Sequence, residues 1–222
     1  MPDQFTQLQE IVISGDGEAA KRLTAELLTA GTAPREILDG ALLPAMDVVG
    51  ARMRSGECFI PEVLLSARTM QGALDLLRPH LAEGESVGLG VVVIGTVEGD
   101  LHDIGKNLVA MLLEGAGFSV INLGTSVPAA KFVAAVKEHR AAILGMSALL
   151  TTTLPRMRET LTALSAAGLR DSVKVMAGGA PVTQSFVTEL GADGYGANAA
   201  LAVEKAKELV GAGVRGRSPA AS

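Results

Sequence analysis

The feature that most constrains the fold is a β-branched run that leads directly into a histidine-containing turn. The run Val91-Val92-Val93-Ile94-Gly95 is apolar throughout, which is typical of a parallel strand covered on both faces. Residues 99–105 follow it, and residues 106–113 carry apolar side chains at helical spacing. In an open α/β sheet, a loop between a strand and its helix lies at the carboxyl edge, where ligands bind. The sequence therefore predicts a ligand site on this loop.

Four further apolar segments, each followed by helical spacing, complete a pattern of alternating strands and helices. We expect strands near 88–95, 118–123, 141–147, 172–178 and 192–195. Five such strands predict an α/β domain, a flavodoxin-like doubly wound five-stranded parallel sheet. We place this domain at residues 88–213.

The N-terminal part of the chain has a different pattern, with no β-branched run and with apolar residues at helical spacing. Helices are predicted at 5–13, 16–30, 34–54 and 61–78, a pattern typical of a four-helix bundle. Gly31 and Gly56 mark helix ends, while Pro34 and Pro61 mark helix starts. Polar residues 79–87 are predicted to form a linker, so the helical domain with its linker takes residues 1–87. Residues 214–222 are expected to be a disordered tail.

Composition excludes several classes of function. The 222 residues, 48% of them hydrophobic, are enough for two small domains. Aromatic residues make up 3% and the net charge is -5, so we expect neither a base-stacking platform nor a basic patch for nucleic acid. We find no membrane-spanning apolar run and no basic, apolar signal at the N-terminus. With Cys58 as the one cysteine, we expect a cytoplasmic protein without a disulfide framework.

His102 is the candidate metal ligand on the loop. A metal-binding imidazole presents one ring nitrogen and fixes the other by a hydrogen bond, often to a carboxylate that Asp100 can supply. The alternative is a histidine that only forms hydrogen bonds within its loop. The pair His102-Asp103 suggests an HD-type phosphohydrolase, but that site needs further His and Asp ligands, and a closed zinc site needs four N or S ligands. Because the chain has only three histidines, one protein ligand suits a metal already held by a macrocycle.

Three motifs carry a resemblance to a known family. They are Asp100-x-His102-x-x-Gly105, Ser147-Ala148-Leu149 and Gly178-Gly179, separated by 41 and 28 residues. In this order and spacing, the chain resembles the corrinoid (cobalamin-binding) proteins of methyltransferase systems and the matching two modules of cobalamin-dependent methionine synthase. The resemblance covers residues 5–212.

The resemblance implies a cobalamin cofactor bound base-off and His-on, in which the nucleotide tail leaves cobalt and His102 replaces it as the lower ligand. It also implies a catalytic relay of His102, Asp100 and Thr153, the last standing where methionine synthase usually has serine. The implied cofactor contacts are Gly99, Asp100, Leu101, His102, Asp103, Ile104, Gly105, Ser147, Leu149, Thr151, Gly178, Gly179 and Ala199.

Three of these features have simpler explanations that stay open. The buried tail needs a place without side chains, as at Gly178-Gly179, but this pair also suits an ordinary strand-to-helix turn. The Ser147 hydroxyl serves the buried polar tail, or else caps a helix or bonds to the backbone. The run 151–153 contacts the tail and Asp100, or else forms the N-cap of the next helix, or does both.

Residues 46–50 and 56–62 look like the family's cap module, which covers the upper, methyl-bearing face of the corrin. Phe59 is the candidate for direct cover, with Met53 and Leu64 behind it, and for each the alternative is an ordinary core residue. A mobile linker would let such a cap leave when a partner enzyme docks.

The resemblance implies a methyl-carrying subunit of a multi-component methyltransferase system, with methylcobalamin as its loaded state. The protein would supply binding, orientation and ligand tuning to the cobalt. The implied partners are a substrate-specific methyltransferase, an acceptor methyltransferase that uses tetrahydrofolate or a thiol, and a reductive activator. The alternatives are the cobalamin-binding subunit of a carbon-skeleton mutase, which uses adenosylcobalamin, and a cobalamin-dependent sensor, which needs an output domain. The methyl donor stays open.

Overall fold

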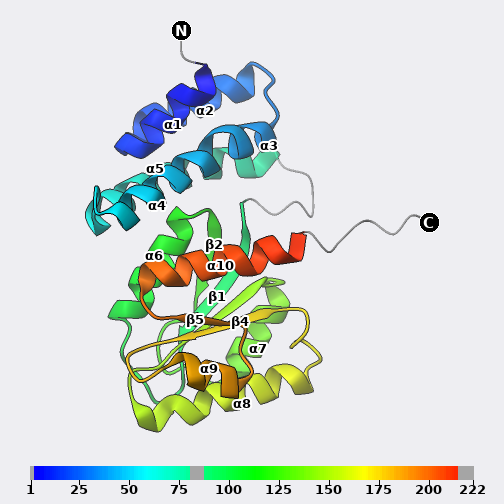
Figure 1. Ribbon diagram of the computed structural model, residues 1–222. Helices are drawn as coiled ribbons and strands as arrows, with labels where there is room; N and C mark the ends of the chain where they lie inside the picture. The colour runs from blue at the N-terminus through cyan, green and yellow to red at the C-terminus, as the bar shows by residue number, and fades with distance from the viewer. Residues whose placement is uncertain (1–2, 81–87, 215–222) are drawn as a thin grey trace, which may run out of the picture. The chain divides into compact units, whose positions relative to one another are not determined.

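A computed structural model describes residues 3–80 and 88–214 (Figure 1). Contacts divide the chain into a helical unit, Met1–Leu89 with Met111–Ser119, and an α/β unit, Gly90–Ala110 with Val120–Ser222. Of the linker predicted at 79–87, residues 81–87 lie outside the described residues. Of the tail predicted at 214–222, residues 215–222 also lie outside them. The first two linker residues belong to a short 3-10 turn, Arg78–His80, that continues the last helix of the helical unit.

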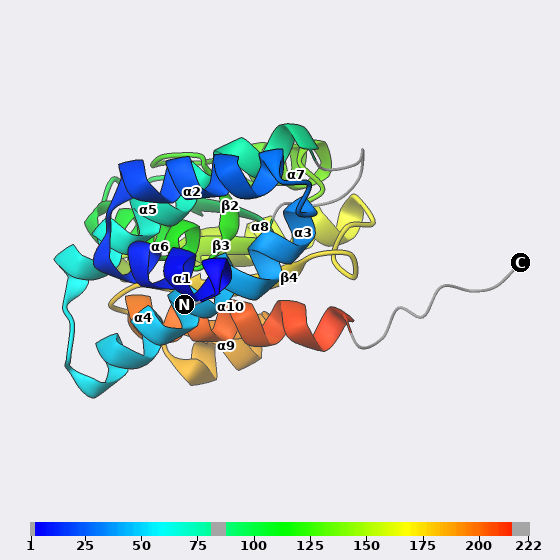
Figure 2. The ribbon, with the colours of Figure 1, turned by 90° about the horizontal axis from the view of Figure 1, so that it is seen from above.

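The helical unit has the helices that the apolar spacing predicts. They are α1 (Gln4–Ser14), α2 (Gly17–Thr29), α3 (Pro34–Ile37), α4 (Leu43–Ser55) and α5 (Ile60–Leu77). Within this unit α2 lies along α5, and α1 packs against α2, α4 and α5 (Figure 2). Leu8, Leu42, Met70 and Leu74 are among the buried side chains that hold these helices together. The helical module predicted before the sheet is confirmed.

The segment predicted as one helix over 34–54 contains a π-helical turn, Leu38–Leu42, between α3 and α4. Pro44 has no N–H to donate to the carbonyl four residues before it, that of Gly40. Gln9 Nε2 donates to this carbonyl instead, at 2.8 Å. The prediction missed the π turn, although Pro44 was the visible signal of a broken helical hydrogen bond.

The α/β unit contains the parallel five-stranded sheet that the sequence predicts. Its strands are β1 (Gly90–Thr96), β2 (Phe118–Asn122), β3 (Ile143–Ser147), β4 (Lys174–Gly178) and β5 (Gly194–Gly196). They lie in the order β2-β1-β3-β4-β5, with parallel pairing from β1 through β3 and β4 to β5. The predicted fold class is confirmed.

Each strand is followed by a helix, and helices lie on both faces of the sheet. They are α6 (Ile104–Gly115), α7 (Ala129–Glu138), α8 (Leu154–Ala166), α9 (Gln184–Leu190) and α10 (Ala199–Val214). Figure 1 shows α10 on the opposite side of the sheet from α8 and α9. Val93, Leu144 and Val175, from neighbouring strands, form one core with Phe132 of α7 and Met157 of α8. Alternate strand residues therefore face opposite helix layers, as a doubly wound sheet requires.

The strand register brings the three sequence motifs to one edge of the sheet. Ser147, the last residue of β3, pairs with Thr96 at the end of β1 and with Gly178 at the end of β4. The loops that follow these residues therefore leave the sheet side by side at its carboxyl edge, which is where an open α/β sheet binds ligands.

Candidate functional site

The carboxylate of Asp100 organises the loop that carries His102. Asp100 is fully buried. Its Oδ1 accepts a hydrogen bond from the backbone N–H of His102 (3.1 Å) and lies 2.8 Å from Nδ1 of the same residue. Its Oδ2 accepts hydrogen bonds from the backbone N–H groups of Leu149 (2.7 Å) and Leu150 (3.1 Å), and Thr153 Oγ1 lies 3.0 Å away. Both carboxylate oxygens are thus engaged by donors from two loops.

These hydrogen bonds keep the carboxylate ionised. Burial by itself would raise the pKa of the Asp100 carboxyl, but the hydrogen bonds from Leu149, His102 and Leu150 outweigh burial and hold the pKa well below its ordinary value. A charged carboxylate only accepts hydrogen bonds, so the proton between the two side chains belongs to Nδ1 of His102. In the neutral ring, Nε2 then carries the lone pair that a metal ligand needs. The His102 side chain is 52% exposed.

Thr153 contacts the carboxylate at the position where the resemblance expects a hydroxyl. Its Oγ1 also lies 2.8 Å from the carbonyl oxygen of Leu150, and one hydroxyl proton can serve only one of these two acceptors at a time. Thr153 is the N-cap residue of α8, but its side chain makes no capping hydrogen bond. Thr153 thus holds the predicted N-cap position, but its hydroxyl lies near Asp100 and Leu150 instead of capping the helix.

Large apolar side chains surround this pair without being buried. The exposed fractions are 73% for Leu101, 87% for Ile104, 41% for Leu149 and 42% for Leu150. A Cβ added to Gly105 would meet no atom within 4 Å, so the surface beside the loop is also open. Exposed apolar residues gathered around a polar centre indicate a binding surface. Their chemistry fits a flat, largely apolar macrocycle laid over His102.

The glycine pair Gly178-Gly179 at the end of β4 is needed for backbone packing. Gly179 has a φ of +123°, and a Cβ there would lie 1.8 Å from the carbonyl oxygen of Ala148. At Gly178 a Cβ would lie 2.9 Å from the carbonyl oxygen of Gly196. The turn explanation thus accounts for Gly179, the close approach of β5 accounts for Gly178, and their contact with a nucleotide tail stays a prediction.

The other predicted contact residues lie at the same edge of the sheet. Ser147 is half-buried at the end of β3, and it is not the cap of the 3-10 turn Thr151–Thr153, whose N-cap is Leu150. Thr151 is exposed at the start of that turn, and Ala199 is the half-buried first residue of α10, three residues after the end of β5. Gly99, before Asp100, has a φ of +80°, which favours glycine.

A buried lysine stands behind the loop, and the sequence reasoning missed it. Lys106 is 3% exposed, and its Nζ donates to Asn107 Oδ1 (2.6 Å) and Asn122 Oδ1 (2.8 Å). Asn107 Nδ2 in turn donates to Asp103 Oδ2 (2.9 Å). Burial lowers the pKa of Lys106, while the Asp103 carboxylate acts in the opposite direction. The periodicity of the sequence gave no signal of this contact, because Lys106 lies in α6 and Asn122 at the end of β2.

In the helical unit, the predicted cover residue is an exposed one. Phe59 is 67% exposed, just before α5, and Glu62 Oε2 accepts its backbone N–H at 2.6 Å. The core explanation is therefore wrong for Phe59. Met53 and Leu64 are half-buried.

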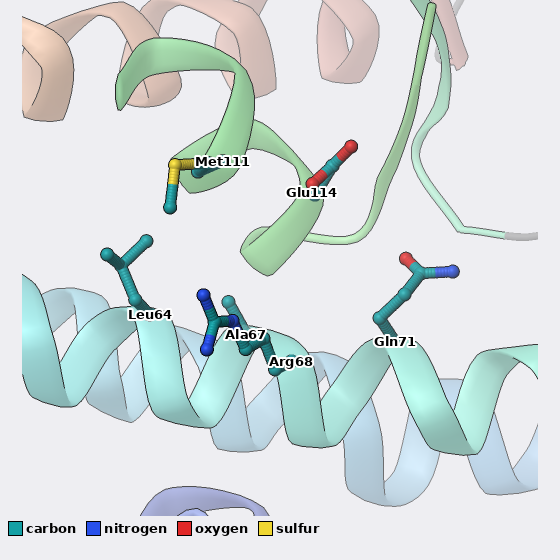
Figure 3. A pocket seen from close by; sticks show the side chains of 6 residues that line it. All are labelled: Leu64, Ala67, Arg68, Gln71, Met111 and Glu114. Atoms are coloured by element: carbon teal, nitrogen blue, oxygen red, sulfur yellow. The ribbon is translucent and has the colours of Figure 1, made fainter. Parts of the chain in front are cut away.

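Leu64 lines a small pocket of the helical unit (Figure 3). The lining consists of Leu64, Ala67, Arg68 and Gln71 from α5 and of Met111 and Glu114 from α6. Leu64 and Met111 point toward one another, and burial raises the pKa of Glu114. None of the loop residues around His102 belongs to this lining.

Two structural features are absent from residues 3–80 and 88–214. No three His, Cys, Asp or Glu side chains come together there to hold a metal ion. No helix in this part of the chain is long and apolar enough to cross a membrane.

Comparison with known proteins defines the class. Two family models match, each described as a B12 binding domain, one over residues 90–204 and the other over residues 4–78. The chain belongs to the B12-binding family of corrinoid proteins. Its cofactor is cobalamin, as the motifs predicted.

Relatives within this family place the chain more closely. Dimethylamine corrinoid protein 1 of Methanosarcina acetivorans is 46% identical over 178 residues, which is 80% of this chain and 84% of the relative. The methanol:cobalamin methyltransferase complex MtaBC of Methanosarcina barkeri contains a similar structure. Its TM-score is 0.81 at 30% identity, covering 98% of this chain and 81% of that one. A cobalamin-binding protein of Desulfitobacterium hafniense is 35% identical, with a TM-score of 0.71 and coverage of 94% and 99%. The chain is thus homologous to corrinoid proteins of methylamine and methanol methyltransferase systems.

Proposed function

We propose that this chain is a methyl carrier that binds cobalamin base-off and His-on, with His102 as the lower ligand of cobalt. The observation that carries the proposal is the 2.8 Å contact between Asp100 Oδ1 and His102 Nδ1, which fixes the ring and leaves Nε2 to a metal. Bound cobalamin supplies a cobalt centre that accepts a methyl group in its Co(I) form and gives it up from methyl-Co(III).

Asp100 and Thr153 would set the electronic character of the imidazole. The buried carboxylate accepts a hydrogen bond from Nδ1–H and thereby leaves Nε2 free to act as a metal ligand. The Thr153 hydroxyl lies within hydrogen-bond distance of both Asp100 Oδ2 and the Leu150 carbonyl, so it can share in holding the carboxylate.

The apolar residues around His102 would hold the lower face of the corrin and keep water from it. Leu101, Ile104 and Leu149 have the exposure that such a contact needs. In this proposal Ser147, Thr151, Gly178, Gly179 and Ala199 lie along the nucleotide tail. Phe59, in the helical domain proposed for residues 1–87, would cover the upper face.

Separate enzymes would load and unload the carrier. A relative named for dimethylamine supports a methylated amine as the donor, used by a substrate-specific methyltransferase. A similar structure comes from a complex with a methyltransferase, which supports such a partner here. An acceptor methyltransferase, using tetrahydrofolate or a thiol, and a reductive activator complete the proposed system.

The histidine ligand can be tested by electron paramagnetic resonance. The full chain is loaded with cobalamin, reduced to Co(II), and prepared once with ordinary and once with nitrogen-15 histidine. If His102 binds cobalt, labelling changes the nitrogen splitting from a triplet to a doublet, and His102→Gly abolishes the doublet while His80→Gln retains it. A triplet that survives labelling means that the cofactor's own base still binds cobalt, which would refute the proposal.

The carrier function needs a separate test. The loaded Co(I) protein is mixed with a methylated donor and a substrate-specific methyltransferase, and formation of the methylated cofactor is followed by its visible spectrum. We expect methylation, and transfer onward when an acceptor methyltransferase is added. Selective binding of adenosylcobalamin without methylation would instead identify a mutase subunit.

A further inference from the structure

A serine beside the histidine loop has an unusual backbone conformation. Among residues 3–80 and 88–214, the non-glycine residues with positive φ are Ser126 (50°) and Arg140 (47°). Residues other than glycine rarely adopt this left-handed conformation, and where they do, surrounding contacts hold them there. Ser126 lies in the loop between β2 and α7, whereas Arg140 lies at the other edge of the sheet, between α7 and β3.

The contacts that hold Ser126 go to the residues just before His102. Its backbone N–H donates to the carbonyl oxygen of Asp100 (2.9 Å), and its Oγ accepts from the backbone N–H of Gly99 (3.1 Å). One residue in the left-handed conformation thus forms two hydrogen bonds to the loop. Ser126 thus bonds to the backbone of Asp100, and the carboxylate of this aspartate bonds to Nδ1 of His102.

The same β2–α7 segment also holds the far end of the histidine loop. Asn122, at the end of β2, accepts from Lys106 Nζ (2.8 Å) and donates to Asn107 Oδ1 (3.0 Å). Asn107 bonds to Asp103, the residue after His102. Asn122 Oδ1 also accepts the N–H of Gly124 (3.1 Å), which shapes the turn that leads to Ser126. The β2–α7 segment therefore forms hydrogen bonds to the chain both before His102, through Ser126, and after it, through Asn122.

We propose that Ser126 is a positioning residue for His102: it fixes the backbone of Gly99 and Asp100, so that the carboxylate presents the imidazole to cobalt. Ser126 touches neither the imidazole nor the carboxylate, and its effect passes through the main chain of Asp100. This inference rests on the proposed histidine ligation.

The test uses the full chain and variants that separate the hydroxyl from the backbone. Ser126→Gly removes the acceptor and adopts the positive φ without strain. Ser126→Ala removes the acceptor but keeps the Cβ, so it provides a second measurement if the glycine variant does not fold. Ser126→Asn restores an acceptor in a residue that tolerates the left-handed region. Arg140→Gly is the matched control, because it relaxes the same conformation far from His102.

Two readouts are taken, one without cofactor. In the apo protein, we expect hydrogen exchange of the Gly99 amide to become about tenfold faster in Ser126→Gly and Ser126→Ala. In the loaded Co(II) protein labelled with nitrogen-15 histidine, the doublet from His102 should weaken in both. Ser126→Asn should restore both readouts, and Arg140→Gly should change neither.

The doublet decides the outcome. If it keeps its wild-type strength in Ser126→Gly and Ser126→Ala, Ser126 has only a local structural role and the proposal is wrong, whatever happens at Gly99. If the wild-type protein itself lacks the doublet, the proposed histidine ligation fails, and this is seen before any variant is compared.

Discussion

Two aspartates of the α/β unit, one at each edge of the sheet, hold their charge in different ways. Asp193, before β5, accepts the backbone N–H of Val175 (2.7 Å) and forms ion pairs with Arg170 (2.9 Å) and Lys174 (3.8 Å). Asp100, at the carboxyl edge, is held by three backbone amides, one hydroxyl and the imidazole of His102. Asp193 is 20% exposed in its side chain, whereas Asp100 is fully buried.

The difference shows how the partners of a buried or half-buried carboxylate decide whether its charge serves a functional side chain or the fold. At Asp193, the cations Arg170 and Lys174 neutralise the charge. The contacts of Asp193 with Lys174 and Val175 connect β4 to the start of β5. At Asp100, neutral dipoles stabilise the charge, and the one ionisable donor is an imidazole that can gain or lose a proton. The charge of Asp100 therefore acts on His102, while that of Asp193 acts on the fold.

The largest expected effect comes from removing the charge of Asp100. In Asp100→Asn, either orientation of the amide turns an N–H toward a backbone N–H, because both carboxylate oxygens accept from amides. We expect the free energy of unfolding of the apo protein to fall by about 3 kcal/mol, measured by urea denaturation. The histidine splitting of loaded Co(II) protein should also weaken. A fully stable variant would contradict the view that dipoles hold this charge.

The hydroxyl of Thr153 should matter less. Thr153→Val keeps the shape but leaves Asp100 Oδ2 and the Leu150 carbonyl without this donor. We expect a loss of about 1 kcal/mol in the free energy of unfolding, measured in the same way. Thr160→Val is the matched control, since that buried hydroxyl of α8 donates to the carbonyl of Arg156 (2.9 Å). Only Thr153→Val should also alter the spectrum of the loaded protein.

Acid should reveal the same charge. The pKa of Asp100 in the folded state lies below its ordinary value of 3.8. The Asp100 charge therefore contributes its full share to the stability of the fold above about pH 5, and this share decreases as the pH falls below 3.8 toward the folded-state pKa. Between pH 6 and pH 3, we expect wild type to lose about 1 kcal/mol more than Asp100→Asn, measured by urea denaturation at both pH values. Equal losses would mean that the fold does not stabilise the Asp100 charge.

The smallest effect belongs to Asp193. Asp193→Asn keeps an acceptor for Val175 and loses the ion pairs with Arg170 and Lys174, which are partly exposed and screened by salt. We expect a loss of about 0.5 kcal/mol in the free energy of unfolding, smaller at high salt, and no change in the spectrum of the loaded protein. A change in the spectrum would contradict the view that the charge of Asp193 acts only on the fold.

Sequence reasoning recovered most of the fold and predicted the contact between Asp100 and His102 that the structure contains. Strand and helix positions follow from periodicity, which depends on neighbours a few residues apart. The π turn at Leu38–Leu42 was missed because a periodic apolar pattern hides the hydrogen bond that Pro44 removes. The buried Lys106 and the left-handed Ser126 were missed because their partners lie in other segments of the chain.

By itself, the sequence determined the alternation of strands and helices and the pairing of Asp100 with His102, because two residues in one short loop stay close in any fold. The tertiary structure alone decided what surrounds that pair. The amides of Leu149 and Leu150 reach Asp100 from 49 and 50 residues away. Ser126 grips the loop because β2 lies beside β1. Such contacts depend on the order of strands in the sheet, which no local pattern contains.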